Sequence, residues 1–465
     1  MRSLTVRAVL FKSIGDLIPF YGLYSLLFAD HGLSTGQISS LFAIWSTTAF
    51  LLEVPSGAWA DTVSRRALLI LSGVLLTGGF ALWTLAPTYL GFALGFVLWG
   101  TAGALVSGTF EALLYDDLVA RGEQGAYARI LGYTRAASET AIVVGIVAGT
   151  PLYLWGGYAL IGWSSVGFAA LHTVIAMSLP SAPKAVSAVD VDELEEVAGE
   201  GDSFLSTGHG AAGVGSSAMS REAVSACDHA LSTGFHGQLS GPSGPVTGSG
   251  PFDRYLSMLK TGVAEAIRVR AVRNGVFLGA LLFGITAFDE YFALLAESVG
   301  VATAVVPLLV GLTVLGSLVG SVLAGRTERM SARTMAIAVG IGAILFLGGA
   351  MIAGLAAHRS SAVYVLTTLG FTAIGISYGI VYNAGVVAGA RLQDAIEGQA
   401  RATVTSVSGL LGEVVSLAVF AFAALATLWW SMPTILALLG ATMLPIALLT
   451  PSWLPPRAAE SADQK

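Results

Sequence analysis

Apolar residues in this chain gather into runs of about twenty, and the runs recur along its whole length. A membrane-spanning helix needs roughly 20 mostly apolar residues, so each run of this length is a candidate span. Six runs precede residue 180, near 8–28, 38–60, 67–86, 89–114, 130–152 and 157–179. Six more follow residue 270, near 272–296, 303–324, 334–355, 361–388, 402–425 and 429–450. We therefore predict an all-α integral membrane protein with twelve transmembrane helices.

The shortage of charged residues supports this prediction. Only 11% of the residues are charged, whereas soluble domains carry roughly 25%, so the chain lacks the side chains to cover a soluble surface. Its expected surroundings are the lipid bilayer, and nothing in the sequence predicts a nucleic-acid partner. The single cysteine, Cys227, excludes a disulfide framework and a cysteine-based metal cluster, and we predict no cofactor.

Basic residues between the runs predict the orientation. Arg359 is the only Lys or Arg in a connection on the side opposite the N-terminus. Those in connections or tails on the N-terminal side include Arg65, Arg66, Arg121, Arg326, Arg329, Arg333, Arg391 and Arg457. Basic residues concentrate in cytoplasmic loops, which predicts a multi-pass protein of the cell (inner or plasma) membrane with both termini in the cytoplasm. Lys12 and Asp16 interrupt the first run, which predicts a retained helix and not a signal peptide.

The segment between the two halves differs in composition. Residues 181–265 begin acidic, become rich in Ser and Gly, and end in a basic, amphipathic stretch from about residue 253. Such a segment cannot bury enough apolar surface to fold, which predicts a flexible cytoplasmic linker whose last part lies along the membrane surface. The predicted organisation is a six-helix bundle over 1–180, this linker, a second six-helix bundle over 266–452, and a cytoplasmic tail over 453–465. Six spans on each side suggest an internal duplication into two pseudo-symmetric bundles.

The connection between the second and third runs combines helix-breaking and charged residues. From residue 53 to residue 66 it reads Glu-Val-Pro-Ser-Gly-Ala-Trp-Ala-Asp-Thr-Val-Ser-Arg-Arg. Pro55 and Gly57 are expected to end the preceding helix. Asp61 can pair with an arginine or lie at a helix N-terminus, where a negative charge is favoured. A weaker echo of this stretch occupies the equivalent gap of the second half, over 316–327.

The pattern of Gly57, Asp61, Arg65 and Arg66 resembles the loop signature between helices 2 and 3 of the major facilitator superfamily. Two positions depart from that signature, which has a basic residue and a second glycine where this chain has Thr and Ser, at residues 62 and 64. Two further stretches are similar to bacterial drug-exporter-like permeases of that family, 108–116 (Gly-Thr-Phe-Glu-Ala-Leu-Leu-Tyr-Asp) and 401–406 (Arg-Ala-Thr-Val-Thr-Ser). The resemblance covers the chain apart from the linker. It implies a monomer of two bundles that rock about a central site, in which the four residues of the pattern have a conformational, gating role.

Ionisable side chains inside the runs are the functional candidates, because a charge in mid-bilayer costs several kcal/mol unless it is paired or hydrated. Asp16 lies half-way along the first run with Lys12 one turn before it, which predicts either a neutralising salt bridge or a functional pair. Arg135 and Glu139 have the same spacing in the fifth run. Glu413 lies in the middle of the eleventh run with no basic residue near it in sequence, which suits a group that binds and releases a proton. We predict that Asp16, Glu139 or Glu413 carries a coupled proton.

Other polar residues are predicted to line a cavity for the substrate, namely Lys12, Glu111, Arg135, Asp289, Tyr378 and Asn383. Glu111 lies toward the cytoplasmic end of its run, where hydration leaves a structural role open. Asp289 is followed by Glu290, and adjacent helical positions point in different directions, so at most one of the two is expected to face a cavity. Aromatic residues either complete the cavity wall or serve as packing and interface anchors, and the candidates are Phe20, Tyr21, Tyr24, Trp99, Tyr133, Tyr291, Tyr378 and Tyr382.

Two other function classes have less support. Residues 375–379 match the G-x-S-x-G pattern of a nucleophilic serine, but they lie inside a run, and no phosphate-binding loop or metal-spaced His/Cys set accompanies them. A non-transporting receptor or scaffold gains nothing from buried charges. We therefore predict a secondary active transporter, not an enzyme, whose partners are protons and a small, partly apolar molecule.

The direction of transport has only a weak signal in the sequence. Proton-linked exporters of the superfamily carry a Gly/Pro-rich motif in helix 5, where residues 145–151 read Gly-Ile-Val-Ala-Gly-Thr-Pro, with the proline displaced by one position and no glycine pair after it. Export in exchange for protons is the first prediction. Proton-coupled or facilitated uptake of a small metabolite is the alternative.

Overall fold

In the computed structural model, the described residues are 2–181, 183, 268–396 and 401–456, and all their regular elements are helices. The N-terminal half contains α1 (Arg2–Asp16), η1 (Pro19–Gly22), α2 (Tyr24–Asp30), α3 (Thr35–Thr62), α4 (Arg65–Leu85), α5 (Tyr89–Val106), α6 (Thr109–Ala120), η2 (Gln124–Ala126) and α7 (Tyr127–Ser178). The C-terminal half contains α11 (Arg270–Gly284), η3 (Ile285–Tyr291), α12 (Phe292–Ser298), α13 (Val306–Thr327), α14 (Ala332–Leu355), η4 (Ala356–His358), η5 (Ser360–Ala362), α15 (Val363–Ala395), α16 (Arg401–Ala426), α17 (Met432–Ala441) and α18 (Met443–Trp453). Almost all of the predicted linker and most of the predicted tail lie outside the described residues.

The helices account for the twelve predicted spans. Among the described residues, nine helical stretches are long and apolar enough to cross a membrane. One of them, Gln124–Ser178, holds two spans, because α7 turns at Gly156 and Gly157, where φ and ψ leave the helical range. The pair α1–α2 and the helix α3 supply the other two spans. The prediction of an all-α, twelve-span protein is confirmed.

Several spans begin at Ser or Thr residues whose side chains cap the helix. Ser34 precedes α3 and forms a capping box with Gln37, in which each side chain bonds the other residue's backbone N–H. Ser64, Thr88 and Ser331 accept backbone N–H groups in the first turns of α4, α5 and α14. These bonds satisfy N–H groups that a helix start leaves without an internal partner.

The prediction that Pro55 and Gly57 end the second span is wrong. Helix α3 continues through Pro55 and ends only at Thr62, and the next helix begins at Arg65 after the extended residues Val63 and Ser64. A proline inside a helix removes one backbone hydrogen bond. Spanning helices tolerate a proline because neighbouring helices, Ser or Thr side chains and local adjustments of the backbone can satisfy the freed carbonyl group.

Two spans predicted to be continuous are broken. The first span stops at Asp16, because Pro19 has no N–H to donate and the preceding Ile18 is extended, and it resumes at Tyr24. The fourth span stops at Val106. Gly108 then adopts a positive φ of 66°, which favours glycine, and the short helix α6 begins. Each break places polar residues beside an interrupted helix in the N-terminal bundle.

Glycines hold α13 and α15 together in the C-terminal bundle. A Cβ atom on Gly316 would lie 2.0 Å from the carbonyl oxygen of Gly375, and one on Gly320 would lie 2.0 Å from that of Gly379. Small residues four apart let helix backbones approach this closely. The glycines of the G-x-S-x-G pattern over 375–379 therefore serve helix packing inside α15, and Ser377 is fully buried.

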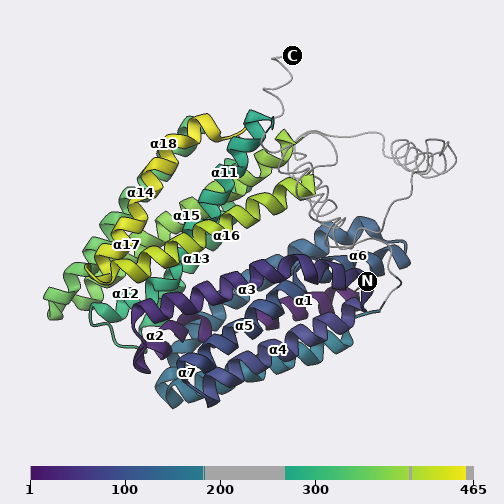
Figure 1. Cartoon of the computed structure of the whole chain (residues 1–465), viewed down its shortest axis with the longest axis horizontal. Helices are drawn as coiled ribbons and strands as arrows, with labels where there is room; N and C mark the ends of the chain where they lie inside the picture. The colour runs from purple at the N-terminus through teal and green to yellow at the C-terminus, as the bar shows by residue number, and fades with distance from the viewer. Residues whose placement is uncertain (1, 182, 184–267, 397–400, 457–465) are drawn as a thin grey trace, which may run out of the picture.

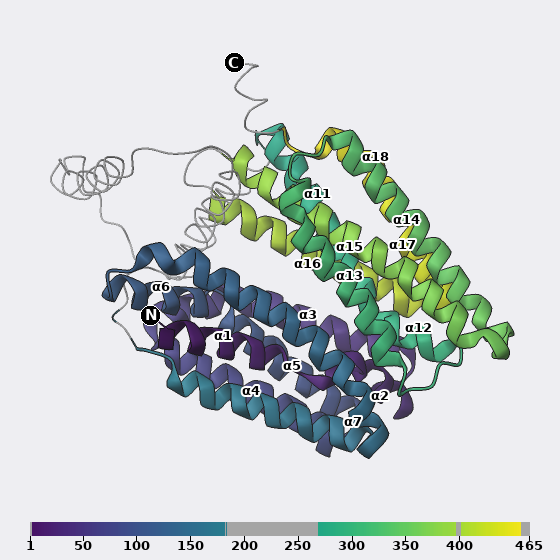
Figure 2. The same ribbon diagram turned by 180° about the vertical axis from the view of Figure 1, so that it is seen from behind.

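The two bundles meet at one end and lie apart at the other (Figures 1 and 2). We call the end that carries Arg2 and Trp453 the terminal end and the opposite end the remote end. The contacts between bundles lie toward the remote end. Ser39 and Tyr291 share a hydrogen bond of 2.8 Å between hydroxyls, and the rings of Phe42 and Phe420 are 5.5 Å apart. The bundles therefore diverge toward the terminal end, on which α6 and the start of α11 lie.

Candidate functional site

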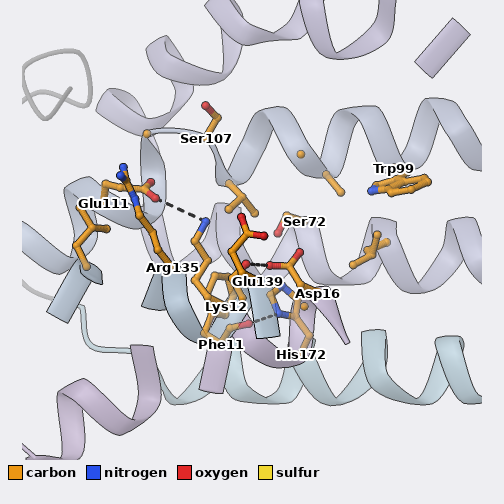
Figure 3. A pocket seen from close by; sticks show the side chains of 18 of the residues that line it. Phe11, Lys12, Asp16, Ser72, Trp99, Ser107, Glu111, Arg135, Glu139 and His172 are labelled. Carbon is orange, nitrogen blue, oxygen red and sulfur yellow. Dashed lines mark hydrogen bonds and ion pairs between the residues drawn. The ribbon is translucent and has the colours of Figure 1, made fainter. Parts of the chain in front are cut away.

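A cavity of about 690 Å³ lies within the N-terminal bundle and gathers most of the charged residues of its spans. Residues of α1, η1, α4, α5, α6 and α7 line it, together with the break between α5 and α6: Phe11, Lys12, Gly15, Asp16, Tyr21, Ser72, Leu76, Trp99, Ala102, Gly103, Val106, Ser107, Gly108, Glu111, Leu131, Arg135, Ser138, Glu139 and His172. Figure 3 shows the charged side chains grouped on one side, with Trp99 set apart from them.

Lys12 pairs with a different carboxylate from the one that its sequence spacing predicts. Its Nζ atom lies 3.6 Å from Oε1 of Glu111, and it also lies 5.1 Å from the ring centroid of Phe110. Of the two interpretations of the Lys12–Asp16 spacing, the salt bridge is therefore not formed, because Nζ pairs with Glu111. The break at Gly108 begins a new helix whose first turn brings Glu111 to Lys12, while Asp16 is at the end of α1 and turns to another partner.

Asp16 accepts a hydrogen bond from the hydroxyl of Ser138 on α7. Glu139, the residue that follows Ser138 on α7, lines the same cavity. Arg135 lies one turn before Glu139 and lines the same cavity. The cavity thus holds three carboxylates and two basic groups, and Asp16 and Glu139 are two of those carboxylates.

His172 is a cavity residue that charge-based selection from the sequence missed. Its Nδ1 atom lies 2.8 Å from the carbonyl oxygen of Phe11, and its ring lies 4.2 Å from the Phe11 ring. A carbonyl oxygen only accepts, so Nδ1 is the protonated nitrogen. A Cβ atom on Gly15 would lie 2.8 Å from the His172 ring, so glycine is needed for this approach. A histidine isolated in the apolar run 157–179 was the available signal.

Of the predicted aromatic residues, Tyr21 and Trp99 line the cavity. Their rings are stacked, with centroids 5.4 Å apart and planes 9° apart. Phe20 and Tyr24 are instead buried in the aromatic core of the same bundle. Tyr133 is 54% exposed outside the cavity. The stacked pair gives the cavity an apolar, planar wall.

The candidates of the C-terminal bundle form separate groups. The hydroxyl of Tyr378 donates to Asp289, and it also lies 3.3 Å from the hydroxyl of Tyr382. Asn383 bonds the Thr327 hydroxyl and the Gly320 carbonyl, each at 2.9 Å, and thereby ties α15 to α13. It lines a second, mostly apolar cavity of about 480 Å³ between α13, α14 and α15.

The sequence around Glu413 suggested an isolated carboxylate. In the structure, its side chain has a hydrogen-bond partner. It accepts a hydrogen bond of 2.5 Å from the hydroxyl of Ser46, which belongs to α3 of the other bundle. Asp289 and Glu290 lie in the short helix η3 and not in a regular α-helix. Sequence neighbours could not reveal the bond to Glu413, because its partner is 367 positions away.

The residues of the gating pattern lie at the terminal end of α3 and the start of α4. Arg65 is buried, and its Nη1 atom lies 2.5 Å from Oδ2 of Asp116 on α6. Arg66 donates to the carbonyl oxygen of Met177 near the end of α7. Gly57 lies on α3, as does Asp61, whose side chain is outside the described part of the structure. The start of α4 is thus connected to α6 and α7 at this end of the bundle.

The sequence profile of the Major Facilitator Superfamily matches residues 9–391. The chain belongs to the Major Facilitator Superfamily. Its membership makes it a membrane transporter, and the predicted resemblance is confirmed. None of the curated proteins compared with the chain matches it.

Solved structures of superfamily transporters share the whole fold. The D-xylose–proton symporter is 16% identical and has a TM-score of 0.60, with 98% of each chain covered. The nucleoside transporter NupG is 11% identical and has a TM-score of 0.60, with 98% of this chain and 99% of NupG covered. An inward-open structure of the xylose transporter XylE from E. coli is 16% identical and has a TM-score of 0.57, with 98% and 96% covered. At these identities the likeness concerns the fold of this superfamily member.

Proposed function

We propose that this superfamily transporter exports a small, partly apolar molecule in exchange for protons, by alternating access between its two bundles. The observation that carries the proposal is the cavity of about 690 Å³, which combines three carboxylates and two basic groups with the stacked Tyr21–Trp99 wall. Intramembrane charges are costly, so a bundle that keeps five of them around one cavity uses them for a ligand or an ion.

Asp16 and Glu139 are the proposed exchange site. Two carboxylates that interact inside a low-dielectric bundle cost free energy when both are charged, and either a proton or a cationic group of a substrate removes that cost. Ser138 keeps Asp16 in place through its hydrogen bond. Tyr21 and Trp99 would hold the apolar part of the substrate, and Lys12 and Arg135 would set which charge the site accepts.

The terminal end is proposed to face the cytoplasm of the cell membrane. The predicted excess of arginines at this end supports that orientation. The divergence of the bundles toward the same end would then be an inward-facing arrangement, from which a cytoplasmic molecule enters the cavity. Gly57, Asp61, Arg65 and Arg66 lie at this end of α3 and α4, where a gating role requires them.

The test is substrate-driven proton movement in proteoliposomes of known orientation, with a panel of drugs, siderophores and metabolites. We expect one ligand class to leave the cytoplasmic side as protons enter, and we expect Asp16→Asn or Glu139→Gln to abolish the proton flux. Glu123→Gln, at an exposed carboxylate between α6 and η2, is the matched control and keeps the flux.

Each part of the proposal has its own contrary outcome. Wild-type flux in all three neutral variants, Asp16→Asn, Glu139→Gln and Glu413→Gln, refutes their role as proton carriers. Proton and substrate moving in the same direction establishes uptake in place of export. Binding without any movement of substrate supports a receptor.

A further inference from the structure

The second cavity, in the C-terminal bundle, has no role in the transport proposed above. It has a volume of about 480 Å³ and follows α13 from Leu312 to Thr327, a stretch of about 22 Å at 1.5 Å per residue. Residues of α14 and α15 complete its walls. Among the described residues that line it, only Thr327, Thr372 and Asn383 have polar side chains. We call this cavity the lateral groove, and its lining suits a long apolar chain.

The floor of the lateral groove consists of backbone. The two glycine pairs at the crossing of α13 and α15, 316 with 375 and 320 with 379, all line it. A side chain at residue 316 or 320 would collide with the backbone of α15. The neighbouring residues Val319 and Ile376 carry branched side chains that are 49% and 51% exposed. The crossing therefore leaves a hollow between raised apolar edges.

The lateral groove opens on the outer side of the C-terminal bundle. Leu315, Val319 and Leu323 form its edge on α13, and all three are exposed. Another side of α13 faces the N-terminal bundle, where a Cβ atom on Gly311 would lie 3.0 Å from Val147. Helix α14, which supplies the opposite wall, lies on the side of its bundle that is turned away from the N-terminal bundle (Figures 1 and 2). In a membrane this side faces lipid, so acyl chains are the apolar molecules that reach the groove.

Arg326 lies where the lateral groove meets the terminal end. It is exposed in the last turn of α13, three positions after Leu323 and seven after Val319, so it continues the edge that those residues form. Side chains on a helix lean toward its N-terminus, which brings the guanidinium back toward the groove. The next residue, Thr327, is itself part of the lining.

The turn between α13 and α14 forms the terminal mouth of the groove. Arg391 on α15 is 4% exposed and donates to the carbonyl oxygen of Glu328 at 3.0 Å and to that of Met330. Met330 lines the groove, so these bonds fix its wall. Helix α14 begins directly after Ser331. The N-terminus of a helix favours a negative charge.

The charges around the mouth are mainly positive. The connection and the adjoining helix ends carry three exposed arginines and one acid, and α15 ends beside them with one arginine and one acid: Arg326, Arg329, Arg333 and Glu328, then Arg391 and Asp394. Basic pockets between membrane helices bind anionic lipid head groups. The groove is also long enough for one acyl chain, because one leaflet contributes about 15 Å, half of a hydrocarbon core of about 30 Å.

We propose that the lateral groove binds one anionic phospholipid from the leaflet at the terminal end. Its acyl chain lies over the glycine floor, and its phosphate lies at the mouth beside Arg326. Because lipid tails are as apolar as leucine, moving a tail from the bilayer into the groove contributes little. Selectivity for this lipid therefore comes from the head group and from the shape of the groove. The inference is independent of the direction and the coupling of transport.

The test is photo-crosslinking of the full chain in phosphatidylcholine nanodiscs. The probe is phosphatidylglycerol with a photoreactive acyl chain, and phosphatidylcholine with the same chain is the matched lipid control. Mass spectrometry of the digested protein measures labelling of residues 312–330 and 372–384 as the probe fraction increases. We expect half-maximal labelling at a probe fraction about fivefold lower for phosphatidylglycerol, the effect of one basic residue on an anionic lipid. An excess of unlabelled phosphatidylglycerol should displace the probe.

Two pairs of variants test the groove and its mouth separately. Val319→Trp fills the groove and should abolish the saturable labelling, whereas Val322→Trp, at a 65% exposed position of the same helix outside the lining, should leave it unchanged. Arg326→Gln should raise the half-saturating probe fraction about fivefold. Arg359→Gln, at an exposed arginine of the remote end, is its control and should behave as wild type.

Three results would overturn the proposal. One is equal labelling by the two probes, which removes the selectivity for an anionic head group. Another is a probe that unlabelled phosphatidylglycerol does not displace, which makes the groove a site for a different molecule or for none. The third is wild-type labelling of Val319→Trp. If Val319→Trp does not fold, the exposed variant Arg326→Gln decides, because a half-saturating fraction equal to the wild type contradicts the assigned position of the phosphate.

Discussion

The buried ion pair between Arg65 and Asp116 allows a quantitative test of what holds α6 against the start of α4. The two side chains approach to 2.5 Å, and each is 3% exposed. Asp116→Asn preserves the shape and an acceptor oxygen but removes the charge opposite a buried guanidinium. Breaking a buried pair from one side costs about 3–5 kcal/mol. This corresponds to a loss of between about a hundredfold and a few thousandfold in the folded-to-unfolded ratio.

The measurement is equilibrium unfolding in mixed micelles, followed by tryptophan fluorescence, for a double-mutant cycle. Asp116→Asn, Asp116→Leu and Arg65→Met should each lose stability in this range, and the last two are the single variants of the cycle. The double variant Arg65→Met/Asp116→Leu should lose less than either, because replacing a whole buried pair by apolar side chains is often close to neutral.

A neighbouring pair on the same helix gives the control. Asp117 bonds Arg121 at 2.5 Å, but the arginine side chain is 42% exposed. Asp117→Asn should therefore cost less than about 1 kcal/mol, as screened pairs do. The reasoning is refuted if Asp116→Asn costs no more than this control, or if the double variant loses the sum of its two single changes.

Three further predictions concern helix packing and the cavity. Gly320→Leu should sharply reduce the yield of monodisperse protein in size-exclusion chromatography, because even a Cβ atom there would lie 2.0 Å from the Gly379 oxygen. Gly348→Leu should not reduce the yield, because a Cβ atom at that position meets nothing within 4 Å. Equal yields would refute the close packing of α13 and α15. Trp99→Ala removes the ring stacked on Tyr21, so the affinity for an aromatic substrate, measured by isothermal titration calorimetry, should fall by up to about tenfold. An aromatic contact of the substrate with this ring contributes about 0.5–1.5 kcal/mol beyond the buried area. Unchanged affinity would exclude this wall from binding. Lys12→Met removes the cation beside Glu111, so competition assays should show tighter binding of cationic ligands and weaker binding of anionic ones, and an unaltered charge preference would contradict its role.

The sequence predicted the spans well because each span can be recognised from its own residues. A run of apolar residues reports burial in lipid whatever its neighbours are. The breaks at Asp16 and Gly108 were not visible in this way, because short polar or glycine-containing stretches occur inside apolar runs with and without a break. Pro55 shows the converse, since its local preference to end a helix is outweighed by the backbone bonds of a continuous span.

For the candidate site, single residues were predictable and their partners were not. Lys12, Asp16, Glu111, Arg135 and Glu139 stood out because charge inside an apolar run is costly, and the structure places all five around one cavity. The pairings depend on helices that are distant along the chain. His172 was passed over because it carries no obligatory charge, and only its contact with the Phe11 carbonyl reveals its place.

The turn of α7 at Gly156 and Gly157 has a consequence for how the protein enters the membrane. Leu154 and Trp155 beside it are 68% and 79% exposed, so no polar loop separates the fifth span from the sixth. During synthesis, Glu139 lies near the centre of the fifth span and Arg135 nearer its start, so each adds a cost of at most about 2.5–3.5 kcal/mol to the insertion of that span. The apolar sixth span follows at once and offsets that cost when both enter the bilayer as one helical hairpin. Arg135 and Glu139, two of the five charged groups around the cavity, therefore reach the membrane together with the span that carries His172.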